Sequence, residues 1–229
     1  MVRNALVVGG NRGIGQAVAL QLAQLGWSVG AASLTGAQDA RRAADVAGCR
    51  VRPYTVDVRD DASVHRLRRD WDAGHDGLDA LVVTAGTAVT GRMAEIEPSD
   101  VQAMLDEHVV GAYRLVKSLR ESLARRGGHV VLLLSRMGRH PRMYGHAYGT
   151  AKSALAHLAG CMAQELADEG VRVNCVSPGA VDTDLLRAAL PGVPRPDTMS
   201  PAEAAGAVVA LLGRDFARVN GAVIDMPGL

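Results

Sequence analysis

The segment Val7-Val8-Gly9-Gly10-Asn11-Arg12-Gly13-Ile14-Gly15 decides the fold of this chain. It joins a short apolar run to a stretch in which Ile14, Val18 and Leu22 recur at helical spacing. Glycines allow a sharp backbone turn and let a pyrophosphate approach the free N–H groups of the helix N-terminus. Its place after a first strand and before a first helix predicts dinucleotide binding; the alternative is a purely structural glycine turn.

Short apolar runs alternate with helical segments along the rest of the chain. We expect strands near residues 4–9, 27–32, 50–56, 78–83, 128–134, 171–176 and 221–226. Several are continuous apolar runs, which is typical of parallel strands covered by helices on both faces. The sequence therefore predicts an α/β fold with one doubly wound, seven-stranded parallel sheet, in a single domain over residues 1–229.

Three signals mark helix ends and a loop. Ser99 with Gln102 predicts a capping box for a long helix to about Arg125. Ser200 followed by Pro201 predicts the start of another helix, which Gly213 would close. The proline-rich residues 190–196 predict an irregular loop, and residues 184–200 would form a substrate loop beyond a strand's carboxyl end.

The segment 145–168 is apolar around most of its helical surface. One side can face the sheet, and a symmetric partner helix would cover the other. We therefore expect a homodimer or homotetramer; the alternative is a tightly packed monomer core.

Composition excludes several classes of protein. Lys and Arg number 25 against 24 Asp and Glu, so the charge excess of a nucleic-acid-binding protein is missing. Cys49, Cys161 and Cys175 are widely spaced, which indicates neither a disulfide framework nor a metal site. No apolar stretch approaches the length of a membrane span. We expect a soluble cytoplasmic protein.

Lys152 lies four residues after Tyr148, a spacing that places both side chains on one helix face. A neighbouring ammonium group favours the ionised phenol, so we expect a lowered pKa for Tyr148 and a role in proton transfer. Ser135 ends an apolar run upstream and is the natural third member of this group.

The choice of dinucleotide is usually made at the end of the second strand. Residues 31–35 carry no carboxylate there that could bind a ribose 2′-hydroxyl. Arg12 in the glycine turn, with Arg41 or Arg42 further on, could meet a 2′-phosphate. We expect NADPH (NADP rather than NAD); the alternative is that Arg12 is simply solvated.

These motifs, in this order, resemble those of the short-chain dehydrogenase/reductase family. The match comprises Gly9-x3-Gly13-x-Gly15, Ser135, Tyr148-x3-Lys152 and Asn174-x-Val176-x-Pro178-Gly179-x3-Thr183, and it extends to Val219–Asp225. The chain is most similar to β-ketoacyl-(acyl carrier protein) reductases and polyketide ketoreductases. The resemblance implies a Rossmann-type fold and an NAD(P)-dependent oxidoreductase.

The resemblance also implies residue roles. Ser135 would hydrogen-bond the substrate carbonyl, Tyr148 would donate the proton, and Lys152 would bind the nicotinamide ribose and lower the phenol's pKa. The implied cofactor-binding residues are Gly9, Asn11, Arg12, Gly13, Ile14, Gly15, Ser33, Asp57, Val58, Ala85, Gly86, Lys152, Pro178, Gly179 and Thr183. Several of these could instead serve only as turn or strand-end packing, above all Val58 and Ala85.

The chain departs from the family pattern at three places. Thr84 replaces an Asn that ties the sheet together, and its hydroxyl keeps one polar group there. His108 stands where the family has an Asn that bends a helix and holds a relay water; an imidazole can relay a proton itself or only pack. Glu169 stands where a carrier-protein reductase has a basic residue, although Arg125 and Arg126 occupy the other expected basic place.

The sequence therefore predicts an NADPH-dependent ketoreductase of a 3-oxoacyl thioester, possibly bound to acyl carrier protein, or of a polyketide ketone. Arg139 and Arg142, between Ser135 and Tyr148, could add positive charge at the mouth of the site. Two alternatives stay open. One is a dehydrogenase of a small secondary alcohol, and the other is a non-catalytic dinucleotide-sensing protein on the same fold.

Overall fold

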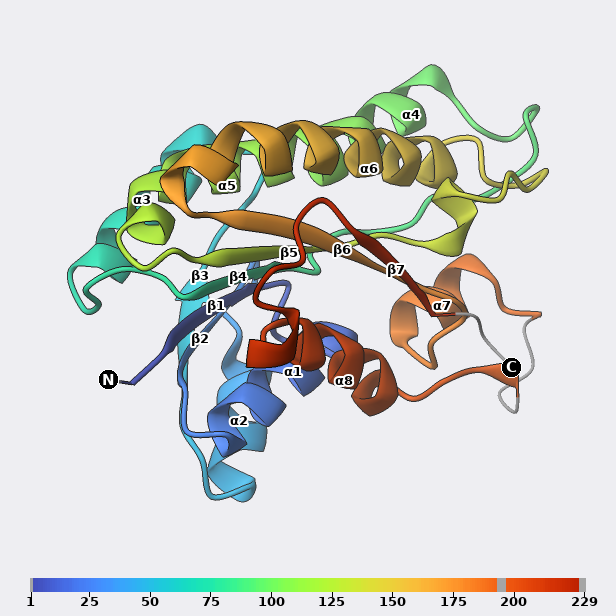
Figure 1. Cartoon of the computed structure of the whole chain (residues 1–229). Helices are drawn as coiled ribbons and strands as arrows, with labels where there is room; N and C mark the ends of the chain where they lie inside the picture. The colour runs from blue at the N-terminus through green and yellow to red at the C-terminus, as the bar shows by residue number, and fades with distance from the viewer. Residues whose placement is uncertain (1, 193–196, 227–229) are drawn as a thin grey trace.

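The computed structural model describes residues 2–192 and 197–226. Its centre is a seven-stranded parallel sheet in the order β3-β2-β1-β4-β5-β6-β7 (Figure 1). The strands are β1 Asn4–Val8, β2 Ser28–Ser33, β3 Val51–Thr55, β4 Ala80–Val83, β5 His129–Leu133, β6 Arg172–Pro178 and β7 Val223–Met226. The predicted fold class is confirmed, and the strand ends differ from the predicted ones by one or two residues.

Helices cover both faces of the sheet (Figure 1). One layer holds α1 Gly13–Gln24, α2 Gln38–Val46 and α8 Pro201–Leu211, and the other holds α3 Asp61–Asp72, α5 Gly111–Ala124 and α6 Tyr148–Glu165. Successive residues of a strand point to opposite faces, so Leu6 joins one core and Val7 joins the other. Continuous apolar strands are stable here because both of their faces are buried.

The long helix predicted to run to Arg125 contains an interruption. It comprises α4 Pro98–Leu105, a π-helical turn Asp106–Val110, and α5. The predicted cap at Ser99 is wrong, because Glu97 occupies the N-cap and its backbone N–H donates to the Asp100 carboxylate at 2.9 Å. Pro98 takes the first helical position, where no N–H is needed.

The predicted start of α8 is confirmed. Ser200 Oγ accepts a hydrogen bond from Glu203 N at 3.2 Å. Gly213 follows the C-cap residue Leu212, and a Cβ there would lie 2.9 Å from Ala210 O. Close approach of the backbone, rather than a left-handed turn, therefore explains this glycine.

The predicted substrate loop is partly helical, because α7 spans Asp184–Ala189. Residues 193–196 of the predicted proline-rich loop lie outside the described residues. In Figure 1, α7 lies beyond the carboxyl end of β6. Three short 3₁₀ turns, Arg136–Gly138, Leu166–Glu169 and Arg214–Phe216, complete the connections described here.

Polar side chains join neighbouring strands at two points. Thr84 Oγ1 donates to Val8 O at 3.1 Å, so the hydroxyl that replaces the family's Asn amide still links β4 to β1. Asn174 is fully buried and accepts from Ala222 N at 2.8 Å, which ties β6 to the start of β7. The Thr84 contact lies at the carboxyl edge of the sheet, where a site would form.

The edge strand β3 carries a proline, Pro53, which lies opposite Ala31 of β2.

Among the helices of the described residues, none is long and apolar enough to cross a membrane.

Candidate active site

A cavity of about 880 Å³ lies at the carboxyl ends of the central strands. All but one of the predicted site residues line it: Gly9, Asn11, Arg12, Gly13, Ile14, Gly15, Ser33, Val58, Ala85, Gly86, His108, Ser135, Tyr148, Lys152, Pro178, Gly179 and Thr183. Segments far apart in the sequence therefore meet in one pocket. The exception is Asp57.

The glycine turn forms one wall of the cavity. Gly15 is required by packing, because a Cβ there would lie 2.3 Å from Gly9 O. The N-terminus of α1 has no side-chain cap at Arg12 and no acidic residue in its first turn. A helix N-terminus with free N–H groups facing a cavity binds anions, so this end of the pocket fits a dinucleotide pyrophosphate.

Ser33, Leu34 and Thr35 extend the pocket beyond the end of β2. Asp39 also lines this region of the cavity. It was not predicted from the sequence, because it lies in α2, beyond the end of the second strand. Its carboxylate pairs with Arg42 and accepts from Asn11 Nδ2 at 2.9 Å.

The predicted role of the α2 arginines is not supported. Neither Arg41 nor Arg42 is among the residues that line the cavity, and Arg42 is held by Asp39 on the helix surface. Arg12 does line the cavity. The pKa of Asp184 is held below its usual range mainly by Arg187, and the charge of Arg12 adds to this effect.

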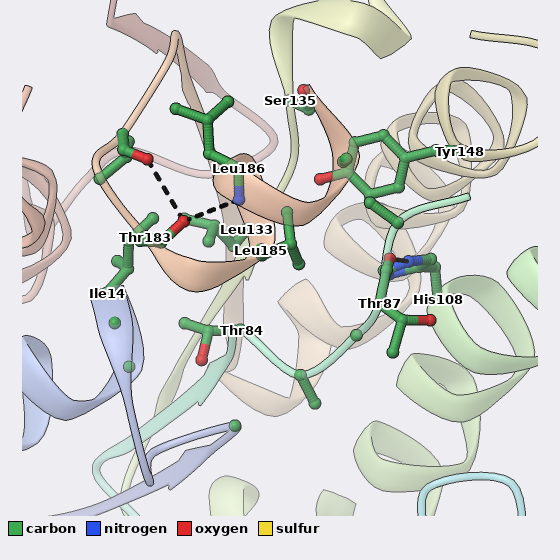
Figure 2. Close-up of a pocket in the computed structure, with 18 of the residues that line it drawn as sticks. Ile14, Thr84, Thr87, His108, Leu133, Ser135, Tyr148, Thr183, Leu185 and Leu186 are labelled. Atoms are coloured by element: carbon green, nitrogen blue, oxygen red, sulfur yellow. Dashed lines mark hydrogen bonds between the residues drawn. The ribbon is translucent and has the colours of Figure 1, made fainter. Parts of the chain in front are cut away.

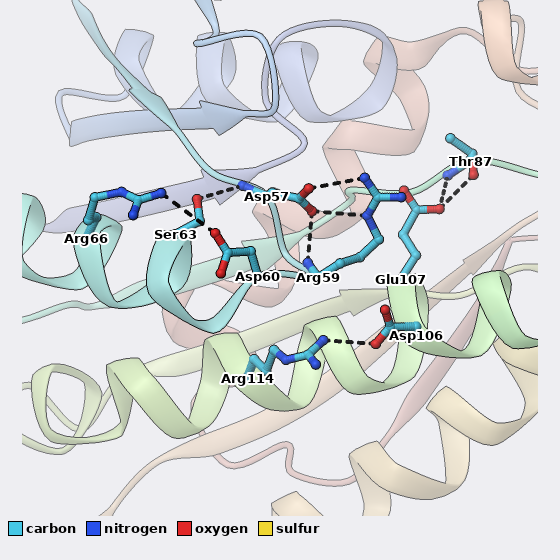
Figure 3. Close-up of polar contacts among 9 residues, drawn as sticks. All are labelled: Asp57, Arg59, Asp60, Ser63, Arg66, Thr87, Asp106, Glu107 and Arg114. Atoms are coloured by element: carbon cyan, nitrogen blue, oxygen red, sulfur yellow. Dashed lines mark hydrogen bonds and ion pairs between the residues drawn. The ribbon is translucent and has the colours of Figure 1, made fainter.

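Asp57 is not among the residues that line the cavity. Its carboxylate binds Arg59, with Nη2 to Oδ2 at 3.1 Å, and its backbone N–H donates to Ser63 Oγ at 3.0 Å (Figure 3). The Arg59 guanidinium holds the pKa of Asp57 below its usual range. Its neighbours Val56 and Val58 line the cavity instead.

Tyr148 begins α6, and in Figure 2 its hydroxyl points into the cavity. Burial raises the pKa of Tyr148 to about 12, and a hydrogen bond with Ser135 opposes that rise. The predicted lowering of this pKa is therefore not found in this structure, because loss of solvation outweighs the hydrogen bond with Ser135. The phenol is held as a protonated group, able to donate a hydrogen bond.

Lys152 lies one turn further along α6 and is 4% exposed. Its Nζ donates to Leu133 O at 2.8 Å and lies 5.5 Å from the centroid of the Tyr148 ring. Burial lowers the pKa of Lys152 to about 8. The geometry thus places a cation beside the phenol, as the four-residue spacing predicted.

His108 comes from the π-helical turn and is 3% exposed. Its Nε2 lies 2.8 Å from Thr87 O, and its ring meets Tyr148 edge-on with centroids 5.4 Å apart (Figure 2). Burial lowers the pKa of His108 to about 3, so the imidazole is neutral at physiological pH. Since a carbonyl only accepts, Nε2 carries the proton and Nδ1 is an acceptor, which has no partner among the described residues.

The segment after β4, which contains Thr87, is held against the π-helical turn Asp106–Val110. Glu107 accepts hydrogen bonds from Thr87 N at 2.9 Å and from Thr87 Oγ1 at 2.6 Å (Figure 3). Both residues line the cavity and were missed from sequence, because the π-helical turn that brings Glu107 to this segment has no recognisable pattern.

An apolar wall closes the cavity opposite Tyr148 and His108 (Figure 2). It consists of α7 residues and their successor: Leu185, Leu186, Ala189 and Leu190. Thr183 Oγ1 caps α7 by accepting from Leu186 N at 3.2 Å, and Thr90 Oγ1 donates to Ala189 O at 2.7 Å. The helix is therefore anchored at both ends over the pocket.

The charged residues considered for carrier-protein contact are engaged in ion pairs. Arg125 lies 3.0 Å from Asp72, and Arg126 lies 3.6 Å from Asp79. Glu169 is bound by Arg120, which offsets its negative charge. These residues present less unbalanced charge to a partner than the sequence alone indicates.

A family model described as short chain dehydrogenase matches residues 3–192. The chain belongs to this family. It is therefore an oxidoreductase of the NAD(P)-dependent kind, acting on CH–OH or C=O groups.

Relatives of differing specificity resemble the chain. It is 35% identical over 189 residues to 2,3-dihydro-2,3-dihydroxybenzoate dehydrogenase of Escherichia coli, covering 81% of this chain and 72% of that protein. It is 29% identical to a 3-oxoacyl-(acyl-carrier-protein) reductase of Mycobacterium bovis, covering 99% and 92%. A short-chain dehydrogenase/reductase structure from Mycobacterium ulcerans matches with a TM-score of 0.89 at 27% identity, covering 98% and 88%.

Proposed function

We propose that this enzyme is an NADPH-dependent ketoreductase that converts a 3-oxoacyl thioester, or a related polyketide ketone, to a secondary alcohol. The observation that carries the proposal is the meeting of Ser135, Tyr148 and Lys152 in one cavity with the glycine turn. Resemblance to 3-oxoacyl-(acyl-carrier-protein) reductases supports the thioester substrate, with acyl carrier protein as its carrier.

The residues present fit a dinucleotide. The uncapped N-terminus of α1 would hold the pyrophosphate, with Gly9, Gly13 and Gly15 allowing its approach. Ser33, Arg12 and Asn11 line the cavity from the end of β2 and the glycine turn, and Lys152, Pro178, Gly179 and Thr183 line it from α6 and from the end of β6 onward. The residues Val58, Ala85 and Gly86 would line the cofactor between them.

The preference for NADPH is supported by charge. Arg12, Ser33 and Thr35 all line the cavity, and such a set of donors would suit a 2′-phosphate. The carboxylate nearest to them, Asp39, is already neutralised by Arg42.

The reaction needs a hydride and a proton. When bound, the reduced nicotinamide supplies the hydride to the carbonyl carbon. Ser135 and Tyr148 would donate hydrogen bonds to the carbonyl oxygen, and Tyr148 would then give its proton to the alkoxide that forms. A secondary alkoxide is a stronger base than a phenolate, so this transfer is favourable even with the raised pKa of Tyr148. Lys152 would stabilise the phenolate that remains.

The test is Tyr148→Phe, which removes the proton donor and leaves the glycine turn intact. Reduction of acetoacetyl thioesters and of bulky aromatic ketones is followed in parallel through the absorbance of NADPH, and again with NADH. We expect the variant to lose at least about a hundredfold in kcat and to keep its affinity for NADPH. Turnover comparable with the native enzyme would refute the assignment.

A second candidate is the oxidation of a small secondary alcohol. The 35% identical relative, a dihydroxybenzoate dehydrogenase by name, favours it. The same residues would catalyse the reverse reaction, with the Tyr148 phenolate as the base that takes the proton from the alcohol. A higher kcat/KM for alcohol oxidation with NAD than for ketone reduction with NADPH would support this candidate.

We also propose a homodimer or homotetramer. Ala154 and Leu158 of α6 are only half-buried, and Tyr113 of α5 is 47% exposed. Light scattering after size exclusion measures the assembly.

We also propose that the protein is located in the cytoplasm, because its three cysteines are widely spaced and indicate no disulfide framework.

A further inference from the structure

The acidic groups of the cavity wall all have partners. Asp39 pairs with Arg42, Asp184 pairs with Arg187, and Glu107 accepts two hydrogen bonds from Thr87. Among the described residues, no other carboxylate lines the cavity. Two of these carboxylates are therefore paired with arginines, and the third, Glu107, is held by two neutral hydrogen-bond donors.

Two of the arginines in the same wall are not balanced. Arg136 and Arg142 both line the cavity, and neither forms an ion pair with any carboxylate of the part of the chain that the structure describes. Arg139, between them, is different, because its Nε lies 3.2 Å from Asp225 Oδ2 and it does not line the cavity. Among the described residues, the wall beside Ser135 and Tyr148 thus carries two arginines without an ion pair, in addition to Arg12 at the glycine turn.

Arg136 and Arg142 lie in the same part of the cavity wall as the two proposed hydrogen-bond donors to the substrate carbonyl. Arg136 follows Ser135 directly, and Arg142 precedes Tyr148 by six residues, so one segment of wall carries both arginines and both proposed donors. Arg142 O accepts from Gly145 N at 3.0 Å, which fixes a turn just before α6. A group bound by these arginines would belong to the substrate.

The facing wall is apolar. Leu185, Leu186 and Leu190 line the cavity from α7 and the residue after it, and the bond from Thr90 to Ala189 holds that helix in place. A ligand between the two walls would place hydrocarbon on one side and negative charge on the other. Guanidinium groups bind carboxylates and phosphates through paired hydrogen bonds, so they match that charge.

We propose that Arg142, assisted by Arg136, binds an anionic group of the substrate, so that the enzyme selects ketones or alcohols that carry a carboxylate or phosphate. This inference rests on the proposed function and specifies its substrate class. Two sources share the chemistry. One is a carboxylate on a compact, mostly hydrocarbon substrate, and the other is a phosphate of the pantetheine arm that carries a thioester.

Matched substrate pairs separate these sources. The first pair is 3-oxocyclohexanecarboxylate and its methyl ester, and the second is acetoacetyl-coenzyme A and the neutral acetoacetyl-N-acetylcysteamine. We expect the native enzyme to prefer the anionic member of one pair by about tenfold or more in kcat/KM, as a charged hydrogen bond predicts. Preference within the first pair assigns a carboxylate, and preference within the second assigns a phosphate.

The variants are Arg142→Gln, Arg142→Lys and the control Arg139→Gln. Arg142→Gln should lower kcat/KM for the anionic member by about tenfold to a hundredfold and leave its neutral partner within about twofold. Arg142→Lys, which keeps the charge, should recover part of the loss. Arg139→Gln should change neither, because that side chain faces Asp225.

Binding without turnover keeps the inference separate from the proposed function. Cyclohexanecarboxylate and cyclohexanecarboxamide are titrated calorimetrically into the NADPH-loaded native enzyme and into Arg142→Gln. We expect tighter binding of the carboxylate that Arg142→Gln abolishes. Equal binding of the two probes, together with no charge preference in either substrate pair, would overturn the anion site. Failure to reduce any ketone, with carboxylate binding intact, would instead overturn the proposed function.

Discussion

Burial sets the ionisation of the groups around Tyr148. It raises the pKa of Tyr148 to about 12 and lowers that of Lys152 to about 8. The sequence places these residues one helical turn apart, and that relation is correct. Their protonation could not be predicted from spacing, because it depends on solvent exclusion by segments as distant as β5 and α7.

His108 is the residue whose role is most open to measurement. Its pKa, lowered to about 3 by burial, keeps the ring neutral across the working pH range. We expect His108→Ala to lower kcat by about tenfold to a hundredfold and to change the cofactor Kd less than about twofold, because the ring lies against Tyr148 and not at the glycine turn. Steady-state kinetics and a cofactor titration measure the two effects.

The pH profile separates a neutral acceptor from a proton carrier at this position. The native enzyme and His108→Asn should show no difference in their acid limbs between about pH 5 and 7, and both should lose activity as Lys152 deprotonates near pH 8. An inflection near neutral pH that disappears in His108→Asn would contradict a neutral imidazole. Unchanged kcat in His108→Ala would leave the residue as packing.

The elements could be predicted to different extents. Strands were found because buried parallel strands such as β5 are continuous apolar runs. The start of α4 was misplaced, because Glu97 and Asp100 form a capping box that lacks the usual Ser or Thr. The π-helical turn Asp106–Val110 has no pattern of its own, so the pocket residue Glu107 that it contributes was not identified.

The segment after β4 packs closely against the π-helical turn, where Gly86 meets the ring of His108. Gly86 has φ +147°, and a Cβ there would lie 2.0 Å from His108 Cε1. Gly86→Ala should therefore lower the free energy of unfolding by about 1 to 3 kcal/mol. In a His108→Ala background the same change should cost about 1 kcal/mol less, because the clash is removed while backbone strain persists.

Urea unfolding of the native enzyme, both single variants and the double variant gives the four free energies of unfolding of this double-mutant cycle. Equal costs of Gly86→Ala in the two backgrounds would show that the ring does not limit the space beside Gly86.

On the scale of the whole molecule, stability depends on two buried imidazoles. Burial lowers the pKa of both His108 and His129 to about 3. His129 Nε2 accepts from Asn174 Nδ2 at 2.7 Å, a bond that requires the neutral ring. The unfolded chain binds these protons near its ordinary pKa of about 6.5, so the folded chain binds fewer protons at acid pH.

Stability should therefore be complete above about pH 6.5 and fall as the pH is lowered toward 3, by up to about 1.4 kcal/mol per pH unit for each histidine. Urea unfolding at several pH values between about 7.5 and 5, above the range where carboxyl groups titrate, measures this slope. His129→Gln should make the slope shallower, and His65→Gln, which removes an exposed ring on α3, should not. A slope unaffected by His129→Gln would refute the contribution of that residue.

The proline in β3 has a consequence for how copies of the chain meet. Val56 N donates to Ser33 O in β2, and backbone N–H groups alternate in direction along an extended strand, so the nitrogen of Pro53 faces outward. That rim of the sheet lacks a donor where an approaching strand would need one. Edge-to-edge polymerisation into fibres through β3 is therefore disfavoured.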